Sequence, residues 1–369
     1  MKEWYVIDDI EKLDSPQLVV YPDRVKHNIE LAIKMTGGTE RLRPHIKTHK
    51  TAEVIRMMLS AGINKFKCAT ISEAALLANE NAADVLLAYQ PVGPKAERLL
   101  ALIKQFPSTK FSCLVDHSAV LHALNEKAKS QNIILDVFVD INVGMNRTGI
   151  KPEGAEVLYL EASSMSHINI KGLHVYDGHF RDKDFATRKE KCDDAFLTVE
   201  RVEEFITDNG LPEPVIIAGG SPTFPIHAQR MDVECSPGTF VFWDHGYGQI
   251  CKEQEFLHAS LLITRVISKP ADGRVCTDMG HKSIAAENEI GSRAYFLNAP
   301  ELKLIGQSEE HGIVDTTGVT GDFEPGTVLY VLPYHICPTV NLHDQIVVVE
   351  DHHINGKWKV VARDREVTN

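Results

Sequence analysis

Lys47 is the residue whose place in the sequence points most directly to chemistry. It closes a short apolar segment in the run Arg-Pro-His-Ile-Lys-Thr-His-Lys (43–50). If this segment is a buried strand, desolvation and neighbouring Arg or His cations lower the pKa of the amine at its end. A lysine with a lowered pKa can form an imine with an aldehyde. Taken alone, a lysine is more often a solvated surface residue, which is what we expect for Lys50.

Two glycine-rich turns with hydroxyl side chains occur later in the chain. Their residues are Gly219, Gly220, Ser221, Pro222 and Thr223 in the first turn and Gly238 and Thr239 in the second. Backbone N–H groups in such turns, together with hydroxyls, can bind one phosphate dianion without a lysine. A single turn of this kind is weak evidence, but two at neighbouring strand ends favour a phosphate site.

A possible metal site lies in the run Tyr-His-Ile-Cys-Pro (334–338). His335 and Cys337 are two residues apart, and both side chains could reach one Zn²⁺ if the chain loops there. Two ligands do not hold a structural zinc ion, but water and substrate could complete an open catalytic site. The alternative is a buried cysteine beside a hydrogen-bonded histidine.

The elements that would position these residues alternate over residues 20–250. Runs rich in Val, Ile and Phe predict strands at 42–47, 65–70, 85–89, 110–115, 135–142, 170–176, 215–219 and 232–235. Amphipathic patterns predict helices at 52–61, 94–105, 117–131 and 183–208. Eight strand–helix units suit a (β/α)8 barrel, although a doubly wound open sheet gives the same alternation. The residues with chemical potential follow strand ends, where such barrels carry their active sites.

The alternation of predicted strands and helices ends near residue 256. Strand-like segments at 259–267, 328–332, 346–349 and 358–362 are separated by Gly, Pro, Asp and Asn. We therefore predict a barrel domain over 20–250 and a mainly β domain formed by 1–19 and 251–369.

Composition excludes several classes of partner. The chain has 39 Lys and Arg against 51 Asp and Glu, a formal charge of −12, which repels nucleic acids and anionic membranes. Its seven cysteines have no paired spacing, which fits a reducing compartment. Acidic residues near the start argue against a signal peptide, and no apolar run is long enough to span a membrane. We expect a cytoplasmic protein with neither a nucleic-acid nor a membrane partner.

Together these motifs resemble those of the D-threonine aldolase and D-serine dehydratase family. These are fold-type III pyridoxal-phosphate enzymes related to alanine racemase. The resemblance includes 43–50, Thr70-x-x-Glu73, 140–149, 219–223 and 335–342, and runs in order over essentially the whole chain. It implies a barrel rather than an open sheet, a C-terminal β domain and a homodimer.

The resemblance also implies roles for individual residues. Lys47 matches the imine lysine, Arg147 an arginine near the phenolate oxygen of the cofactor, and Tyr176 a tyrosine lining the pocket. Gly219, Gly220, Ser221, Thr223, Gly238 and Thr239 correspond to phosphate-binding loops, Thr70 joins the cofactor-binding set, and His335 and Cys337 fall on metal-ligand positions. The histidine that acts on the substrate hydroxyl in the aldolases has no counterpart at the matching position, Asp182, and His179 is our candidate for that role.

We therefore predict a lyase that uses pyridoxal 5′-phosphate and one divalent metal on a small D-3-hydroxy amino acid. Cysteine favours zinc, with manganese or magnesium as alternatives. His-x-Cys resembles the dehydratases, whereas Pro-Thr-Val-Asn-Leu (338–342) resembles the aldolases. We favour aldolase cleavage to glycine plus an aldehyde, with D-serine dehydratase-like loss of ammonia as the alternative. An amino-acid racemase and a non-catalytic cofactor-binding protein are further alternatives.

Overall fold

The computed structural model describes residues 2–365, which divide into two compact units. The barrel unit comprises Leu31–Lys47, Ile55–Gly238 and 364–365. The β unit comprises 2–30, Thr48–Val54 and Thr239–Arg363. The domain limits at residues 20 and 250 stay a prediction about where independently folding parts begin and end.

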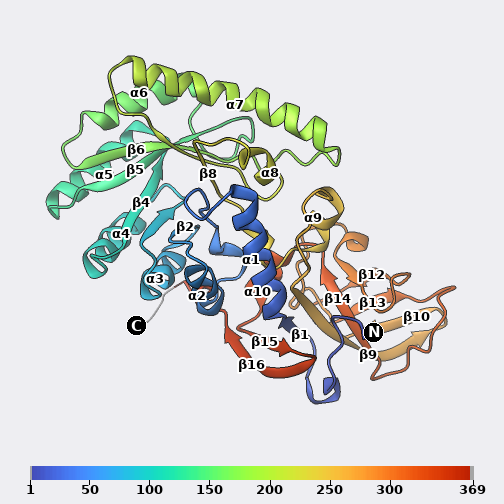
Figure 1. Cartoon of the computed structure of the whole chain (residues 1–369). Coiled ribbons are helices and arrows are strands. Elements are labelled where there is room, and N and C mark those ends of the chain that lie inside the picture. Colours follow the sequence, from blue (N-terminus) through green and yellow to red (C-terminus); the bar gives the residue numbers. More distant parts are fainter. Residues whose placement is uncertain (1, 366–369) are drawn as a thin grey trace. The chain divides into compact units, whose positions relative to one another are not determined.

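Seven parallel strands curve around the interior of the barrel unit, in chain order from β2 to β8 (Figure 1). They are β2 (Lys65–Cys68), β3 (Asp84–Leu87), β4 (Lys110–Val115), β5 (Leu135–Ile141), β6 (Ile168–Val175), β7 (Val215–Ala218) and β8 (Val233–Cys235). Leu86, Leu114, Phe138 and Ile217 form a buried apolar cluster. A barrel of parallel strands followed by a mainly β part is what the sequence predicts, and this fold class is confirmed.

Single bridges close the barrel between β8 and β2, where the sequence predicts a full strand over 42–47. Leu42 pairs with Cys235, and His45 pairs with Lys67. The N–H of Arg43 donates to the carbonyl of Cys235 at 2.9 Å. Beyond His45 the chain turns into a 3-10 helix, Ile46–Thr48, because Pro44 and the tight turn interrupt the ladder.

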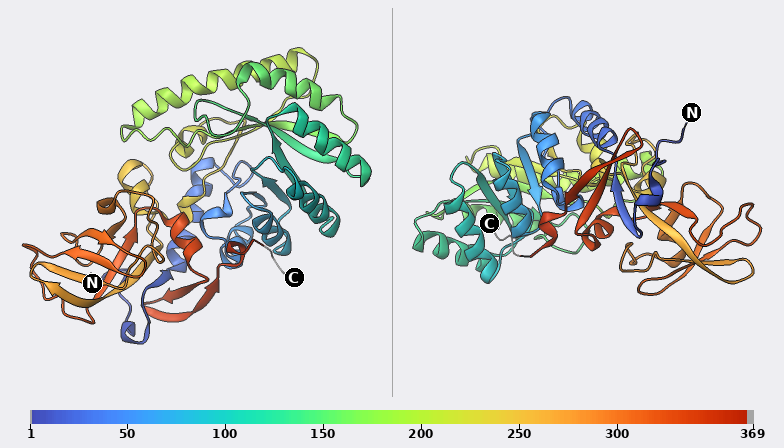
Figure 2. Two further views of the ribbon diagram at one scale, coloured as in Figure 1. Left: turned by 180° about the vertical axis from the view of Figure 1, so that it is seen from behind. Right: turned by 90° about the horizontal axis from the view of Figure 1, so that it is seen from below.

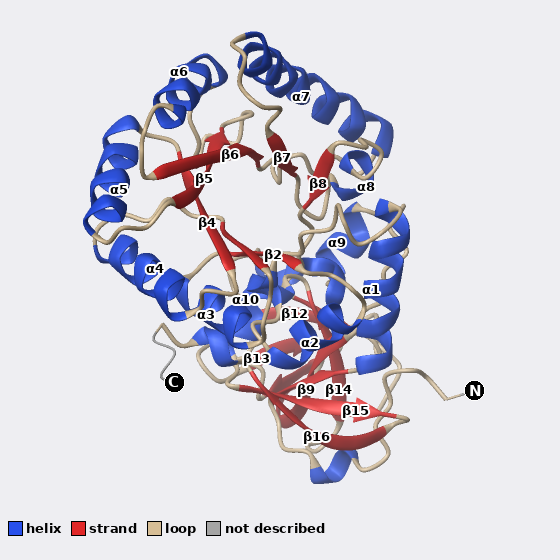
Figure 3. Ribbon diagram, turned by 60° about the vertical axis from the view of Figure 1, so that its left-hand side comes forward, coloured by secondary structure: helices blue, strands red, loops and turns tan. Residues whose placement is uncertain are grey.

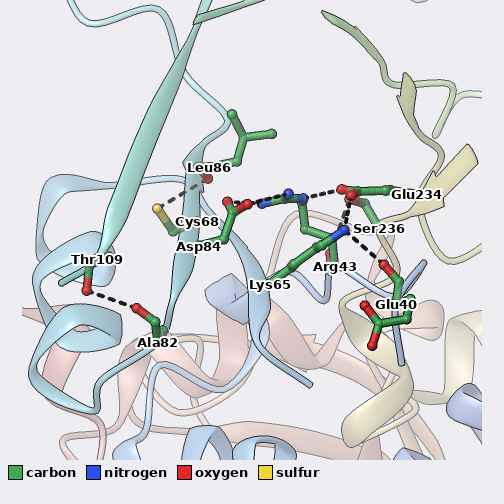
Figure 4. Close-up of polar contacts among 10 residues, drawn as sticks. All are labelled: Glu40, Arg43, Lys65, Cys68, Ala82, Asp84, Leu86, Thr109, Glu234 and Ser236. Carbon is green, nitrogen blue, oxygen red and sulfur yellow. Dashed lines mark hydrogen bonds and ion pairs between the residues drawn. The ribbon is translucent and has the colours of Figure 1, made fainter. Parts of the chain in front are cut away.

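Charged side chains cross the barrel interior beside this closure (Figure 4). Arg43 is 3% exposed, and its guanidinium donates to Glu234 at 2.7 Å and to Asp84 at 2.6 and 3.1 Å. Lys65 adds a 2.5 Å ion pair to Glu234. Burial works to lower the pKa of Arg43, but the hydrogen bonds and charges of the two carboxylates outweigh burial and raise it. The buried cation Arg43 therefore links β3 to β8, and the partly exposed Lys65 links β2 to the same carboxylate of β8.

Helices surround these strands on the outside (Figure 3). The helices up to α8 are α1 (Pro22–Thr36), α2 (Ala52–Ser60), α3 (Ile71–Asn79), α4 (Pro94–Gln105), α5 (Ser118–Ser130), α6 (Pro152–Ser163), α7 (Phe185–Asp208) and α8 (Phe224–His227). Thr70 caps α3 by accepting a hydrogen bond from the N–H of Glu73, as the Thr-x-x-Glu pattern predicts. Asp184 caps α7 in the same way. Among residues 2–365, no helix is both long and apolar enough to cross a membrane.

The β unit is built on a nine-stranded sheet in which β1 (Gln17–Val20) lies between β9 (Ser260–Ala271) and β15 (Gln345–Glu350). The remaining strands are β10 (Arg274–Thr277), β11 (Ala294–Phe296), β12 (Lys303–Gln307), β13 (Gly312–Asp315), β14 (Val328–Pro333) and β16 (His353–Lys359). Figure 2 shows most of them in orange and red from two further sides. Two short helices, α9 (His245–Ile250) and α10 (Ile336–Leu342), complete the unit. Two apolar clusters form its core, one around Leu262 and Phe296 and one around Val19 and Val347.

Because Arg43 helps to close the barrel, we expect its substitution to lower the stability of the protein. Arg43→Met leaves Glu234 and Asp84 without their buried cation, so we expect the free energy of unfolding to fall by about 3 kcal/mol. Arg56→Met is the matched control, because Arg56 is 61% exposed in its pair with Glu80 and should change stability by less than about 1 kcal/mol. The change in stability of each variant is measured from its urea unfolding midpoint, provided that the dependence of the unfolding free energy on urea concentration is unchanged. Equal effects of the two variants would contradict the importance of the closure.

Candidate active site

A cavity of about 470 Å³ opens in the barrel unit beside the C-terminal ends of its strands. The lining residues Ala88, Asp116 and Tyr176 each follow directly after the last residue of a strand. Its polar lining includes Lys47, Lys67, Asp140, Arg147, His174 and Tyr176. The structure thus gathers residues that are far apart in the sequence into one concave site, where parallel barrels place their chemistry.

Lys47, Tyr176 and Arg147 come together in this cavity. The Nζ atom of Lys47 lies 5.7 Å from the centroid of the Tyr176 ring, and the Cζ atom of Arg147 lies 4.7 Å from the same centroid. The backbone N–H of Lys47 donates to Nδ1 of His45 at 3.2 Å, which fixes the turn that carries the lysine. An amine, a guanidinium and an aromatic face in one cavity suit a planar, anionic aldehyde such as pyridoxal 5′-phosphate.

The loop after β5 positions Arg147. The side-chain oxygen of Asn142 accepts hydrogen bonds from the N–H groups of Gly144 and Asn146, each at 3.0 Å. The N–H of Gly149 donates to Asp116 at 2.9 Å, which ties the far end of the loop to the end of β4. An otherwise exposed arginine is therefore presented by a loop that is fixed at two points.

The turn after β7 approaches Tyr176 closely. Gly219 has a φ of +82°, and a Cβ there would lie 2.7 Å from His227. A Cβ at Gly220 would lie 3.0 Å from the ring of Tyr176. Larger residues would displace the turn or the ring, so the two glycines are required by this approach. Both glycines are buried, and their N–H groups donate inside the protein, that of Gly219 to the carbonyl of Val175 at 2.9 Å and that of Gly220 to Thr223. Neither glycine lines the cavity, so phosphate binding by this turn stays a prediction.

Thr223 uses its hydroxyl inside the protein. It donates to Oδ1 of Asp177 at 2.6 Å and accepts a longer hydrogen bond from the N–H of Gly220 at 3.3 Å. It therefore shapes the turn, while any contact it makes with a phosphate remains a prediction. Ser221 and Gly238 are buried. Thr239 belongs to the β unit, where its hydroxyl oxygen lies 3.7 Å from Sγ of Cys337.

Asp177, which follows the end of β6 by two residues, forms a buried group with Cys192 and His227. Its possible ligand atoms are all within 4.8 Å of one another, so a metal ion is geometrically conceivable. However, His227 Nε2 is 2.7 Å from Asp177 Oδ2, and Arg230 donates to His227 Nδ1 at 3.1 Å. These hydrogen bonds occupy both ring nitrogens, and the guanidinium adds a positive charge. The group instead supports the chain next to Tyr176 and fixes its position.

His179 lies in the loop after β6, and it is not among the residues that line the cavity. Its ring packs on Phe180 with centroids 4.0 Å apart, and a Cβ at Gly144 would lie 3.3 Å from its Nε2. Nδ1 is buried without a hydrogen-bond partner among residues 2–365. Burial lowers the pKa of His179, against a smaller effect of Asp177 that raises it. Its imidazole is therefore neutral at neutral pH, as a general base requires.

Lys50 differs in position from what the sequence suggests, whereas Thr70 takes the helix-capping position that its Thr-x-x-Glu pattern predicts. Thr70 caps α3 and lines a smaller neighbouring cavity of about 210 Å³, which shares Ala69 and Tyr89 with the larger one. Lys50 is 9% exposed with a φ of +55°, so it is not the solvated lysine that we expected. The prediction was wrong because the residue lies in a tight turn rather than on a helix surface.

The segment with the possible metal ligands forms the start of α10 in the β unit. His335 is the N-cap, and the N–H of Ile336 donates to Asp244 at 3.0 Å. This turn brings His335 into hydrogen-bond contact with Cys337. Burial lowers the pKa of His335, but the hydrogen bond with Cys337 and nearby negative charges outweigh burial and raise it to about 9.

The surroundings of this pair fit a metal site. His335 Nδ1 is 2.5 Å from Glu287, and a carboxylate on one ring nitrogen is the usual support of a metal-binding histidine. Cys337 Sγ lies 3.1 Å from the hydroxyl of Thr48. Thr48 directly follows Lys47 in the chain. A nitrogen and a sulfur ligand with room for others suit zinc in particular.

Sequence reasoning missed Lys67 and His174. Both line the cavity and both are buried, at 2% and 4% exposure. The signal was present as polar residues within predicted strands, at alternate positions with apolar ones. That alternation indicated that each strand has a polar and an apolar face, but it did not show which face points into the barrel.

Comparisons with known proteins agree with this geometry. Residues 20–245 match the alanine racemase N-terminal domain family, and residues 259–349 match the serine dehydratase domain family. The chain is 30% identical to the D-threonine aldolase of Arthrobacter sp., over 96% of this chain and 94% of the relative. It is 25% identical to the D-threo-3-hydroxyaspartate dehydratase of Delftia sp. strain HT23, over 90% and 93%.

A solved structure shows the same arrangement of elements. The D-threonine aldolase from Filomicrobium marinum superimposes with a TM-score of 0.86 at 25% sequence identity, covering 95% of each chain. Family models account for most of both parts of the sequence, and the relatives are matched over nearly their whole length. The chain therefore belongs to the alanine racemase N-terminal domain family, in the branch of fold-type III pyridoxal-phosphate enzymes that contains the D-threonine aldolases and the hydroxyaspartate dehydratases.

Proposed function

We propose that the protein is a pyridoxal-phosphate- and metal-dependent lyase that cleaves a D-3-hydroxy amino acid into glycine and an aldehyde. The observation that carries this proposal is the grouping of Lys47, Arg147 and Tyr176 around one cavity. The 30% identity to a D-threonine aldolase over nearly the full chain supports the substrate class and the type of reaction. A homodimer is proposed from family resemblance alone.

The chain's own residues have separable tasks in this proposal. When bound, the cofactor supplies an electron sink for the bond that breaks. Lys47 attaches the cofactor and is available to move a proton at the substrate's α-carbon. Arg147 would hold the phenolate side of the ring, and Tyr176 would line its face. The turn at Gly219 and Gly220 would hold the phosphate, with Ser221, Thr223, Gly238, Thr239 and Thr70 as further candidates.

We further propose that His335 and Cys337 hold one divalent metal ion, with zinc favoured. Its chemistry would be to polarise the substrate's β-hydroxyl as a Lewis acid. His179 would accept the proton of that hydroxyl in the aldolase reaction, which its neutral imidazole supports. Glu287, through its hydrogen bond to His335, would orient the histidine.

A dehydratase is the second candidate. The similarity to a hydroxyaspartate dehydratase over 90% of the chain supports it, as does the soft His-x-Cys pair. In that reaction the hydroxyl leaves rather than losing its proton, so no base near Tyr176 is required. A racemase or a non-catalytic cofactor carrier would produce neither set of products.

Lys47→Ala should abolish the visible absorption of protein-bound cofactor and the activity, because no other group replaces the covalent attachment. Lys104→Ala is the control, since Lys104 is exposed on α4, remote from the cavity lining. Borohydride reduction followed by peptide mapping identifies the attached lysine. Label on a lysine other than Lys47 would overturn the assignment.

Metal analysis of protein purified without chelators should show about one zinc per chain, as expected of a mononuclear catalytic site. Cys337→Ala should lose the metal and reduce activity by at least about 100-fold, since the Lewis acid is removed. Cys276→Ala, at another partly exposed cysteine of the β unit, is the control. Full activity of metal-free Cys337→Ala would exclude a catalytic metal there.

Product identity tests the proposed reaction itself. D-Threonine incubated with the holoenzyme should yield glycine and acetaldehyde, measured by chromatography, with D-serine assayed in parallel. His179→Ala should then lower kcat by about 100-fold or more, because the base is lost. Formation of 2-oxobutyrate or pyruvate with ammonia, and of no glycine, would establish the dehydratase instead. Neither product pair, with D-threonine epimerised, would establish a racemase.

A further inference from the structure

Lys67 is a second amine in the cavity, and the proposed reaction does not use it. It lies on β2, is 2% exposed and lines the same cavity as Lys47. Its Nζ atom is 5.9 Å from the centroid of the Tyr176 ring, so it belongs to the same cluster of cations as Lys47 and Arg147. Among residues 2–365, no carboxylate forms an ion pair with it within about 4 Å, the usual limit for such a pair. A buried ammonium without such a partner is costly unless a ligand supplies one.

One protein atom accepts a hydrogen bond from Lys67. Its Nζ lies 3.4 Å from Nε2 of His174, and His174 Nδ1 lies 2.7 Å from Oδ1 of Asp140. Burial lowers the pKa of His174, against the opposing effect of Asp140 that raises it. The ring is therefore neutral, and the carboxylate assigns its hydrogen to Nδ1, which leaves the lone pair of Nε2 for Lys67.

The remaining hydrogen-bonding capacity of Lys67 is unused by the described part of the chain. An ammonium carries three hydrogens, and His174 accepts only one of them. The cavity that Lys67 lines is the remaining space into which the other hydrogens can be directed. A bound molecule with a negatively charged oxygen could accept the hydrogen bonds that Lys67 does not make to the protein.

The charges around Lys67 determine its protonation when the cavity holds no anion. Burial lowers its pKa most, and the charges of Lys47 and Arg43 lower it further. Asp140 and Asp177 act in the opposite direction, and the result is a pKa of about 7. Arg147 and neutral His174 complete the polar surroundings. An anionic oxygen placed against Nζ would raise this pKa, because it favours the charged form.

We propose that Lys67 binds an anionic oxygen of the molecule held in the cavity, and that it takes up a proton from solvent as it does so. The oxygen is either the phenolate of the cofactor ring or the carboxylate of the amino-acid substrate. The inference rests on the proposed function, because that function supplies both anions. Lys67 is then a positioning residue that is mainly neutral above neutral pH in the free protein and charged in the complex.

Calorimetry on the apoprotein at pH 8 tests this with 4-deoxypyridoxine 5′-phosphate, which keeps the ring hydroxyl and phosphate but cannot react with Lys47. Titrations in two buffers with different ionisation enthalpies measure the protons taken up on binding. D-Threonine is then added to the saturated complex in a second arm. Uptake of close to one proton in the first arm assigns the phenolate, and uptake confined to the second arm assigns the carboxylate.

Two substitutions separate this role from a purely structural one. Lys67→Met should weaken binding of the relevant ligand by about ten-fold or more, the usual loss for one charged hydrogen bond. Lys67→Arg should largely keep the affinity while losing the proton uptake, since arginine is charged both before and after binding. In the wild type the dissociation constant should rise with pH above 7, and in Lys67→Arg this dependence should be absent. Lys104→Met should match the wild type.

The outcomes also distinguish this inference from the proposed function. If neither arm takes up a proton through Lys67 while D-threonine is still cleaved, the inference is wrong and the proposed function stands. If the wild-type apoprotein binds neither the analogue nor pyridoxal 5′-phosphate, both fail together. Because Lys67→Arg keeps a buried cation in place, its pH dependence decides the question even where Lys67→Met does not fold.

Discussion

A buried guanidinium closes the barrel, and the position of the candidate site depends on that closure. Strands β8 and β2 are joined through the segment that contains Leu42 and His45, which forms only single bridges. Where the ladder is this sparse, side-chain bonds contribute more to the closure, and Arg43 spans the gap with two carboxylates inside a low-dielectric interior. Lys47 follows four residues later, so the position of its amine depends on a barrel that is closed.

The charge of the side chains around the cavity is opposite in sign to the net charge of the whole chain. The chain carries a net charge of −12, yet three basic side chains, those of Lys47, Lys67 and Arg147, lie within about 6 Å of the Tyr176 ring centre, a distance at which a cation still interacts with an aromatic face. Confining like charges in a poorly solvated cavity is unfavourable until an anion enters. Negative charge elsewhere keeps polyanions away from the surface, while a small anion that reaches the cavity meets a concentrated positive field. The cavity and the surface together therefore favour the binding of small anions over large ones.

Much of the architecture could be predicted from the sequence, because apolar segments and capping residues such as Thr70 are local signals. The strand expected at 42–47 is largely replaced by single bridges and a 3-10 helix, since local propensity does not report how a ladder ends. In the site, Lys47 lines the cavity as expected, and that expectation needed both its position at the end of an apolar segment and the family resemblance, because such a lysine alone is more often a surface residue. Lys67 and His174 were not, because they alternate with apolar residues in β2 and β6, and in a surface strand such alternation separates solvent from core. Only the closed barrel shows that the polar side here faces the barrel interior, where Lys67 and His174 line the cavity.

The place of β1 in its sheet has a consequence for how the protein is made. Residues 17–20 pair with β9 on one side and with β15 on the other, so their partners lie at 260–263 and at 347–348, far along the chain. The ribosome releases the whole of 31–238 before the first of these partners exists. The N-terminal strand is therefore without its sheet partners while the strands of the barrel unit are synthesised. Until residues 347–348 are made, its Leu-Val-Val run lacks at least one of its two neighbouring strands, and an unpaired apolar strand favours aggregation.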